Sequence, residues 1–130
     1  MAKILIADDE PHIRLLLQQT LEEFEEKGVV LLTAKNGVEA LETIKAEQPD
    51  IVFLDIMMPE MNGLDVCNKV KNELNLQDVY IIMLTARGQE DDMQQAKAVG
   101  ADIYIMKPFS YEDIVEKTSM VLKSKLGDLW

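Results

Sequence analysis

Five short apolar runs divide this chain, and each is followed by a stretch in which apolar residues recur at helical spacing. The runs cover residues 3–7, 29–34, 51–55, 79–84 and 102–106. The middle run, Ile51 to Leu54, has no polar residue before Asp55, which is typical of a strand buried on both faces. Because strands that alternate with helices favour parallel pairing with right-handed crossovers, we predict an α/β fold: a doubly wound, five-stranded parallel sheet with five helices.

Turn and cap residues indicate where the helices begin and end. Pro11 suits the first position of the first helix, which we expect to end at Gly28. Pro59 prevents the third strand from continuing, and Asn62-Gly63 forms a turn that also begins the third helix. Two capping boxes are expected: Asn36 with Glu39, and Ser110 with Asp113. The expected buried positions of the first three helices are Ile13, Leu16, Leu17, Thr20, Leu21 and Phe24; Val38, Leu41 and Ile44; and Leu64, Cys67, Val70 and Leu74.

The length and charge of the chain narrow the classes of function. At 130 residues and 14.7 kDa the chain is expected to be one domain, residues 1–130, with a core from about 3 to 125. A net charge of −11 disfavours binding to nucleic acid or to an anionic membrane. The single cysteine, Cys67, excludes an internal disulfide, and no apolar run approaches the roughly 18 residues of a membrane span. We therefore expect a cytoplasmic protein, with Cys67 buried and inert.

Polar side chains stand where four of the five predicted strands end. Asp8 and Asp9 follow the first strand, Asp55 ends the third, Thr85 follows the fourth and Lys107 follows the fifth. In an open α/β sheet, ligands bind outside the carboxyl ends of the strands. If the first and third strands are neighbours, three carboxylates meet there, and each close pair repels by about 4 kcal/mol at a surface-like dielectric. A hard cation such as Mg²⁺ removes that repulsion. Carboxylates, a metal, an ammonium and a hydroxyl together suit phosphoryl transfer.

The chain resembles the receiver domains of response regulators in two-component signalling, including those of chemotaxis. The resemblance covers essentially the whole chain and depends on five motifs: Asp8-Asp9, Asp55 with Met58-Pro59, Asn62-Gly63, Thr85-Ala86 and Lys107-Pro108. It implies a flavodoxin-like sheet with strand order 2-1-3-4-5. It also implies a cis bond between Lys107 and Pro108.

The resemblance assigns a role to each acidic residue. Asp55 would be the phosphoacceptor, which takes its phosphoryl group from a phosphohistidine on a partner kinase. Asp9 and Asp55 would ligate Mg²⁺ directly, together with the backbone carbonyl of Met57, and Asp8 would act mainly through water. Mn²⁺ is the alternative metal, and no other cofactor is expected. Such a protein is a phosphorylation-switched regulator that assists its own phosphorylation and dephosphorylation, rather than an enzyme with a separate substrate.

The resemblance also implies a switch and two kinds of partner. Lys107 would pair with the phosphoryl group, Thr85 would hydrogen-bond to it, and Tyr104 would rotate inward. The surface of the fourth helix, fifth strand and fifth helix would change as a result. The partners would be a sensor histidine kinase or phosphotransfer protein, and a downstream protein or a detached output domain. Since only residues 125–130 follow the last helix, we expect either a stand-alone regulator or a fragment of a longer one.

Three other functions are weighed against this one. A phosphatase of the haloacid dehalogenase type also uses an aspartate nucleophile, but it needs a second acid two residues later, where this chain has Met57. A flavodoxin-like cofactor binder needs donors after the first strand, where Asp8-Asp9-Glu10 would repel phosphate. The third is a receiver-shaped module that is not phosphorylated.

Three further residues have an expected role. His12, the only histidine, is expected to lie on the surface. Met57 and Arg87 are expected to slow hydrolysis of the phosphoryl group.

Overall fold

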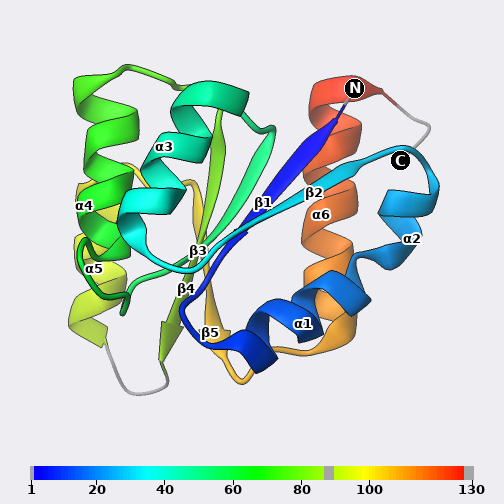
Figure 1. The fold of residues 1–130 in the computed structure, drawn as a ribbon, viewed down its shortest axis with the longest axis horizontal. Helices are drawn as coiled ribbons and strands as arrows, with labels where there is room; N and C mark the ends of the chain where they lie inside the picture. Colours follow the sequence, from blue (N-terminus) through cyan, green and yellow to red (C-terminus); the bar gives the residue numbers. More distant parts are fainter. Residues whose placement is uncertain (1, 87–89, 128–130) are drawn as a thin grey trace.

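The computed structural model describes residues 2–86 and 90–127 and contains one five-stranded parallel sheet (Figure 1). The strands lie in the order β2-β1-β3-β4-β5, so the direction in which successive strands are added to the sheet reverses between β1 and β3. This confirms the predicted fold class and strand order. The strand bounds are β1 Lys3–Ala7, β2 Val30–Ala34, β3 Ile51–Asp55, β4 Tyr80–Ala86 and β5 Ile103–Lys107.

Helices cover both faces of the sheet (Figure 1). Helices α3, α4 and α5 pack on one face, and α1, α2 and α6 pack on the other. Among the described residues, none of these helices is long and apolar enough to cross a bilayer. The helix bounds are α1 Pro11–Thr20, α2 Glu22–Glu26, α3 Gly37–Glu47, α4 Gly63–Asn68, α5 Glu90–Ala98 and α6 Tyr111–Leu126, with a π-helical segment η1 at Lys69–Glu73.

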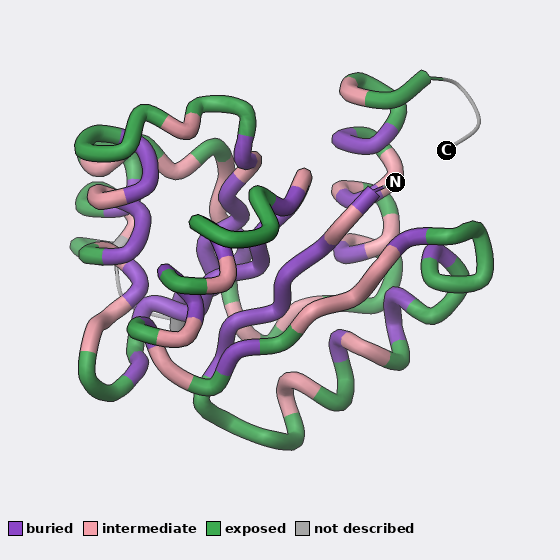
Figure 2. The backbone as a smooth tube through the Cα atoms, turned by 45° about the horizontal axis from the view of Figure 1, so that its top comes forward, coloured by how far each residue is buried: buried purple, intermediate pink, exposed green. Residues whose placement is uncertain are grey.

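The sheet separates two hydrophobic clusters, and its central strands supply side chains to both. Figure 2 shows that the central strands are buried along much of their length. In β3, Val52 and Leu54 join the cluster beneath α3 and α4, whereas Ile51 and Phe53 join the one beneath α1 and α6. All five residues of β3 are buried, while the edge strand β2 is mostly half-exposed. This alternation explains why the sequence of β3 is uniformly apolar.

Three helices begin with side-chain caps, two of them at the predicted capping boxes and one at the predicted helix start Asn62-Gly63. In each of them a side-chain oxygen of the residue just before the helix accepts the backbone N–H three residues later, which satisfies a donor that the helix itself leaves unpaired. The bonds are Glu39 N to Asn36 Oδ1 at 2.8 Å, Asp65 N to Asn62 Oδ1 at 2.9 Å and Asp113 N to Ser110 Oγ at 3.1 Å. The peptide bond between Lys107 and Pro108 is cis, as expected.

The prediction of five continuous helices was wrong in two places. The first predicted helix breaks at Leu21, whose ψ of 6° is not helical, and α2 follows it. Leu21 and Phe24 are both buried beside the break. The third predicted helix changes from α to π geometry at Lys69. In this wider turn the buried Lys71 reaches Asp102, with Nζ 2.9 Å from Oδ2.

Three residues of the predicted buried rows are exposed instead: Leu16 by 46%, Val38 by 39% and Leu74 by 39%. Leu16 lies at the flank of the apolar stripe of α1, farther from the core than Leu17. Val38 is in the first turn of α3, and Leu74 follows the end of η1. Residues at the flank or the end of a helix are not fully covered by neighbouring elements, so helical spacing alone overestimates their burial.

Candidate functional site

Three carboxylates meet at the carboxyl ends of β1 and β3. Carboxylate oxygens of Asp8, Asp9 and Asp55 all lie within 4.8 Å of one another. The two strands are neighbours, with Ala7 in register with Leu54, so the residues that follow are brought together. Asp8 and Asp55 are buried, whereas Asp9 is exposed. The predicted convergence of these acids is therefore present.

Lys107 bridges two of the carboxylates. Its Nζ lies 3.0 Å from Asp8 Oδ2 and 3.3 Å from Asp55 Oδ1, and 3.8 Å from Glu10 Oε1. The lysine comes from the end of β5, which is separated from β3 in the sheet by β4. Its four-carbon side chain spans that distance and delivers one positive charge among the acids. Since each bond is charge-assisted, the bridge compensates part of the repulsion between them.

Two residues that the sequence analysis did not select hold the turn between β1 and α1. The carboxylate of Asp8 accepts the backbone N–H of Glu10 at 2.9 Å. Arg14 donates from Nη1 to the backbone carbonyl of Asp8 at 2.6 Å. The first bond orients the Asp8 side chain, and the second holds its backbone. The acidic run Asp8-Asp9-Glu10 could have pointed to Glu10. Arg14 could not be found in this way, because it lies one turn into α1 and contacts Asp8 only in the folded turn.

The pKa of Asp55 is raised from an ordinary value of 3.8 to about 7. Burial is the largest cause, the negative charges of Asp8 and Asp9 act in the same direction, and Lys107 opposes them. The pKa of Lys107 is raised as well, because attraction to Asp55 and Asp8 outweighs the effect of its own burial. Without a further cation, Asp55 therefore takes up a proton near neutral pH.

Thr85 completes the group of residues at the strand ends. Leu84 is in register with Asp55, so Thr85 follows directly on the neighbouring strand. Its Oγ1 is buried and has no hydrogen-bond partner among the described residues. A buried hydroxyl without a partner is unfavourable, and such groups often mark a position where a ligand oxygen binds.

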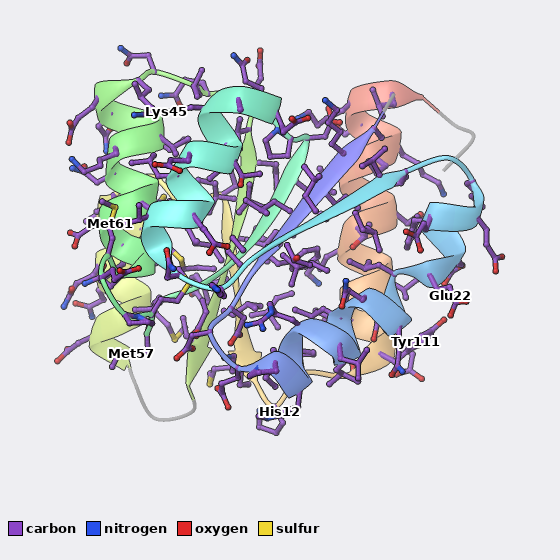
Figure 3. All side chains as sticks on the ribbon, viewed as in Figure 1. His12, Glu22, Lys45, Met57, Met61 and Tyr111 are labelled. Carbon is purple, nitrogen blue, oxygen red and sulfur yellow. The ribbon has the colours of Figure 1, made fainter. Side chains whose placement is uncertain are left out.

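The other residues selected from the sequence include Met57, Tyr104 and His12, and Figure 3 labels Met57 and His12. Met57 is 70% exposed, two residues after Asp55. The chain after Met57 returns so close to the end of β3 that a Cβ added at Gly63 would lie 2.3 Å from the Asp55 carbonyl oxygen. Tyr104 is half-buried and packs against the cluster beneath α3, α4 and α5. His12 lies on the surface as expected, with its side chain 74% exposed and Nε2 3.4 Å from Glu10 Oε2.

Two further sequence expectations concern Cys67 and Arg87. Cys67 is buried, and burial raises the pKa of its thiol to about 12, so it stays protonated at neutral pH. This agrees with an inert cysteine. Arg87, which we expected to slow hydrolysis together with Met57, lies outside the described residues.

The acidic group fits a hard divalent cation. Two oxygens bound to one Mg²⁺ lie at most about 4.2 Å apart, since each Mg–O distance is about 2.1 Å. The carboxylate oxygens of Asp8, Asp9 and Asp55 are within 4.8 Å of one another, so small rotations bring them into that range. All three are the oxygen donors that Mg²⁺ and Mn²⁺ prefer.

Comparison with known proteins identifies the family of this chain. Residues 4–119 match the family model of the response regulator receiver domain. The chain belongs to this family. The match covers most of the chain, and it includes β1, β3, β4 and β5 with their terminal acids, threonine and lysine.

Curated relatives of this receiver domain are regulators of transcription. The chain is 41% identical over 121 residues to the probable transcriptional regulator ycf27 of Guillardia theta, covering 93% of this chain and 45% of the relative. It is 37% identical to the alkaline phosphatase synthesis transcriptional regulatory protein PhoP of Bacillus subtilis, covering 93% and 48%. The chain thus spans about half the length of the curated relatives it matches.

Solved receiver structures share the fold. The chemotaxis protein CheY4 of Vibrio cholerae superimposes with a TM-score of 0.80 at 33% identity, covering 94% of this chain and 99% of that one. The DrrB receiver domain, described as activated by BeF₃, gives a TM-score of 0.82 at 25% identity, covering 95% and 98%. Neither the structure nor the comparisons support the alternative of a haloacid dehalogenase phosphatase.

The raised pKa of Asp55 makes the stability of this receiver domain depend on pH. Between about pH 4 and 7 the folded state holds a proton that the unfolded state has released, so the free energy of unfolding falls as pH rises through this window. Asn cannot ionise and avoids this loss. We expect Asp55→Asn to match the parent at pH 4 and to exceed it by about 2–4 kcal/mol at pH 8 without metal.

Urea denaturation at both pH values, with chelator present, measures the difference. The exposed acid Glu42 on α3 provides the control, since Glu42→Gln should change little at either pH. Added Mg²⁺ should narrow the gap at pH 8, because it stabilises only the ionised carboxylate. An advantage of Asp55→Asn that is equal at pH 4 and pH 8 would contradict the assigned pKa.

Proposed function

We propose that this receiver domain accepts a phosphoryl group on Asp55 in a two-component phosphorelay. The observation that carries the proposal is the position of Asp55 at the centre of the site, within 4.8 Å of Asp8 and Asp9 and 3.3 Å from Lys107. A carboxylate is a competent nucleophile toward phosphorus when the surrounding charge is neutralised. The donor is a phosphohistidine on a sensor histidine kinase or a phosphotransfer protein.

Each residue of the site has a part in the transfer. An oxygen of ionised Asp55 attacks phosphorus, the bond from phosphorus to the histidine nitrogen breaks, and the imidazole leaves with the electron pair. Asp8, Asp9, Asp55 and the Met57 carbonyl would hold Mg²⁺ or Mn²⁺, which neutralises phosphoryl oxygens and favours the ionised form of Asp55. Lys107, already beside Asp55, would turn to a phosphoryl oxygen.

Thr85 and Tyr104 would convert this local charge into a change of surface. The buried hydroxyl of Thr85 has no protein partner among the described residues, so a phosphoryl oxygen would give it one. Its movement would leave room near β5, into which the half-buried Tyr104 would rotate. New charge-assisted bonds stabilise a minor conformer by population shift. The altered surface comprises α5, β5 and α6, and it would contact a downstream protein or output domain.

Phosphorylation should require both Mg²⁺ and Asp55. Incubation with a small acyl phosphate, without a kinase, should add about 80 Da, the mass of one HPO₃ group. Chelation of the metal should abolish the increment, because the acids then repel the donor. Intact-mass spectrometry checks this, with Asp55→Asn as the test variant and Asp65→Asn, an exposed acid on α4, as the control. An unchanged increment in Asp55→Asn would exclude Asp55 as the acceptor.

The switch should reach the far side of β5. With Mg²⁺ and a beryllofluoride mimic of the phosphoryl group, amide chemical shifts should change at the site and also over residues 96–110. In Thr85→Ala the changes near the acids should persist, while those around Tyr104 should shrink, since the hydroxyl that couples them is gone. Changes confined to the metal site in the parent protein would argue against the switch.

Met57 should control how long the phosphoryl group lasts. Hydrolysis needs a water in line with the bond to phosphorus, and a thioether neither donates nor strongly accepts the hydrogen bonds that would orient one. Met57 is the exposed side chain beside this path, whereas Met58 is buried. Met57→Asn should therefore release phosphate faster than the parent, and Met57→Leu at the parental rate. Timed phosphate release from preloaded proteins decides, and an equal or slower rate for Met57→Asn would rule out this gate.

A further inference from the structure

Gly37 is the first residue of α3, directly after the cap Asn36, and it is buried. Its φ is not in the left-handed region, so the backbone conformation there does not require glycine. Alanine is a better helix former than glycine, so helix formation alone would favour alanine at this position. A contact with a neighbouring segment, rather than the helix itself, therefore accounts for the glycine.

The backbone of Met61 packs directly against Gly37. A Cβ added at residue 37 would overlap the Met61 carbonyl oxygen and lie 2.6 Å from the Met61 carbonyl carbon and 2.7 Å from its Cβ. Carbon atoms in contact are about 3.5–4.0 Å apart, so even alanine does not fit unless the chain shifts. The obstructing atoms include backbone atoms, which cannot turn aside as the tip of a side chain can.

Met61 lies in the loop between β3 and α4, residues 56–62, which we call the Met57 loop. The backbone N–H of Gly63 donates to the carbonyl of Ile56 at 2.8 Å and closes this loop at its base. Ile56 and Met61 pack in the hydrophobic cluster beneath α3 and α4, whereas Met57 is exposed. Figure 3 labels both Met57 and Met61. Because the loop is short and closed, a displacement of Met61 also displaces Met57, four positions earlier.

A second glycine allows the same loop to close. A Cβ added at Gly63 would lie 2.9 Å from the Asp55 carbonyl carbon and 3.0 Å from the Ile56 Cα, again closer than carbon atoms pack. Gly63 thus brings α4 against the end of β3, and Gly37 brings α3 against Met61. The helices α3 and α4 lie side by side on this face of the sheet (Figure 1). The Met57 loop is therefore held at both ends by contacts of backbone with backbone.

We infer that Gly37 is a positioning residue for the proposed cation site. Because it has no side chain, it leaves room for the Met61 backbone and so keeps the Met57 carbonyl in place. The inference rests on the proposed function, in which this carbonyl and the three acids would hold Mg²⁺. Magnesium requires near-ideal octahedral geometry with ligands at about 2.1 Å, so displacing one of them weakens binding. Groups that orient ligands without touching the metal typically change metal affinity by about 10–100-fold.

A substitution at residue 37 tests the inference directly. Gly37→Ala should lower the affinity for Mg²⁺ at least about tenfold. Ile44→Ala is the matched control, because Ile44 is fully buried in the same helix and the same cluster, about 10 Å along the axis from Gly37. It leaves a cavity and destabilises the domain, but it should bind Mg²⁺ like the parent. Amide chemical shifts during a Mg²⁺ titration give each affinity, and urea denaturation gives each stability.

Two further measurements separate the position of the loop from the stability of the fold. Without metal, Gly37→Ala should change the amide chemical shifts of residues 56–62, whereas Ile44→Ala should leave them near the parental values. Met61→Ala keeps Gly37 and removes part of the side chain that packs the loop on the cluster. Since Met61 is only half-buried, this variant should fold, and it should also bind Mg²⁺ more weakly than the parent.

The outcomes distinguish this inference from the proposed function. Parental Mg²⁺ affinity in Gly37→Ala, an equal loss in Ile44→Ala, or shift changes confined to α3 would each overturn the inference and leave the proposed function intact. If Gly37→Ala does not fold, parental Mg²⁺ affinity in Met61→Ala would overturn it. A parent protein that does not bind Mg²⁺ would contradict the proposed function, and the inference with it.

Discussion

The ammonium of Lys107 between Asp8 and Asp55 is the interaction on which the site depends. It joins Lys107 to Asp8, 99 positions away in the sequence, and to Asp55, 52 positions away, and so links the ends of three strands of the sheet. Buried carboxylates at this spacing would repel each other without it, and a buried charge that loses its partner is strongly destabilising. The strand order places β5 near enough for the lysine and leaves β1 and β3 adjacent for the acids. The strand order of the fold is therefore also the order that the site requires.

The lysine compensates the acids only in part. Asp55 still has a pKa of about 7, and the buried hydroxyl of Thr85 still lacks a partner among the described residues. Both conditions make the site without ligands less stable. A bound cation would relieve the repulsion among the acids, and a phosphoryl oxygen would give the Thr85 hydroxyl a hydrogen-bond partner. Such a site can change its conformation when a ligand binds, because the ligand binds more tightly to the conformation in which these groups have partners.

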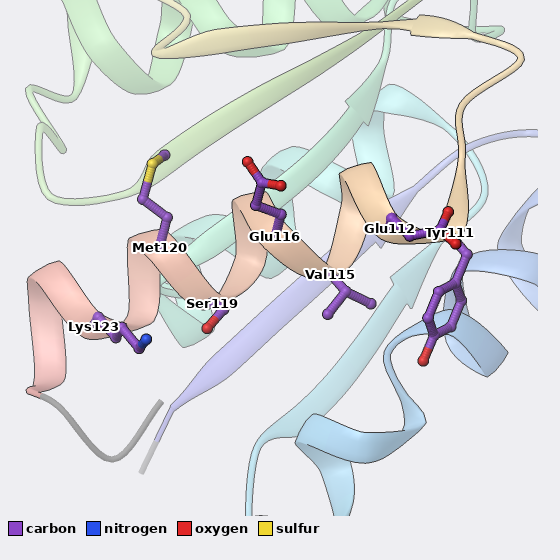
Figure 4. A pocket seen from close by; sticks show the side chains of 7 residues that line it. All are labelled: Tyr111, Glu112, Val115, Glu116, Ser119, Met120 and Lys123. Atoms are coloured by element: carbon purple, nitrogen blue, oxygen red, sulfur yellow. The ribbon is translucent and has the colours of Figure 1, made fainter.

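The two sides of α6 serve different ends. Its buried face, with Ile114, Thr118 and Leu122, packs beneath the sheet and holds the chain that follows the cis Lys107-Pro108 bond. Its outer face carries charges and apolar side chains that nothing in the described part of the chain covers (Figure 4). Since the helix begins only four residues after Lys107, a change at the site has a short path to this outer face.

The sequence by itself determined the alternation of strands and helices, the starts of three capped helices and the polar residues at four of the five strand ends, because these depend on local periodicity and on single residues. The family resemblance supplied the strand order. The tertiary structure decided the rest: the break at Leu21, the π-helical turn at Lys71 and the exposure of Leu16. It also decided the role of Arg14 and the lack of a partner for the Thr85 hydroxyl among the described residues. These features follow from which distant segments meet in space, and a local pattern contains no information about the atoms that it will contact.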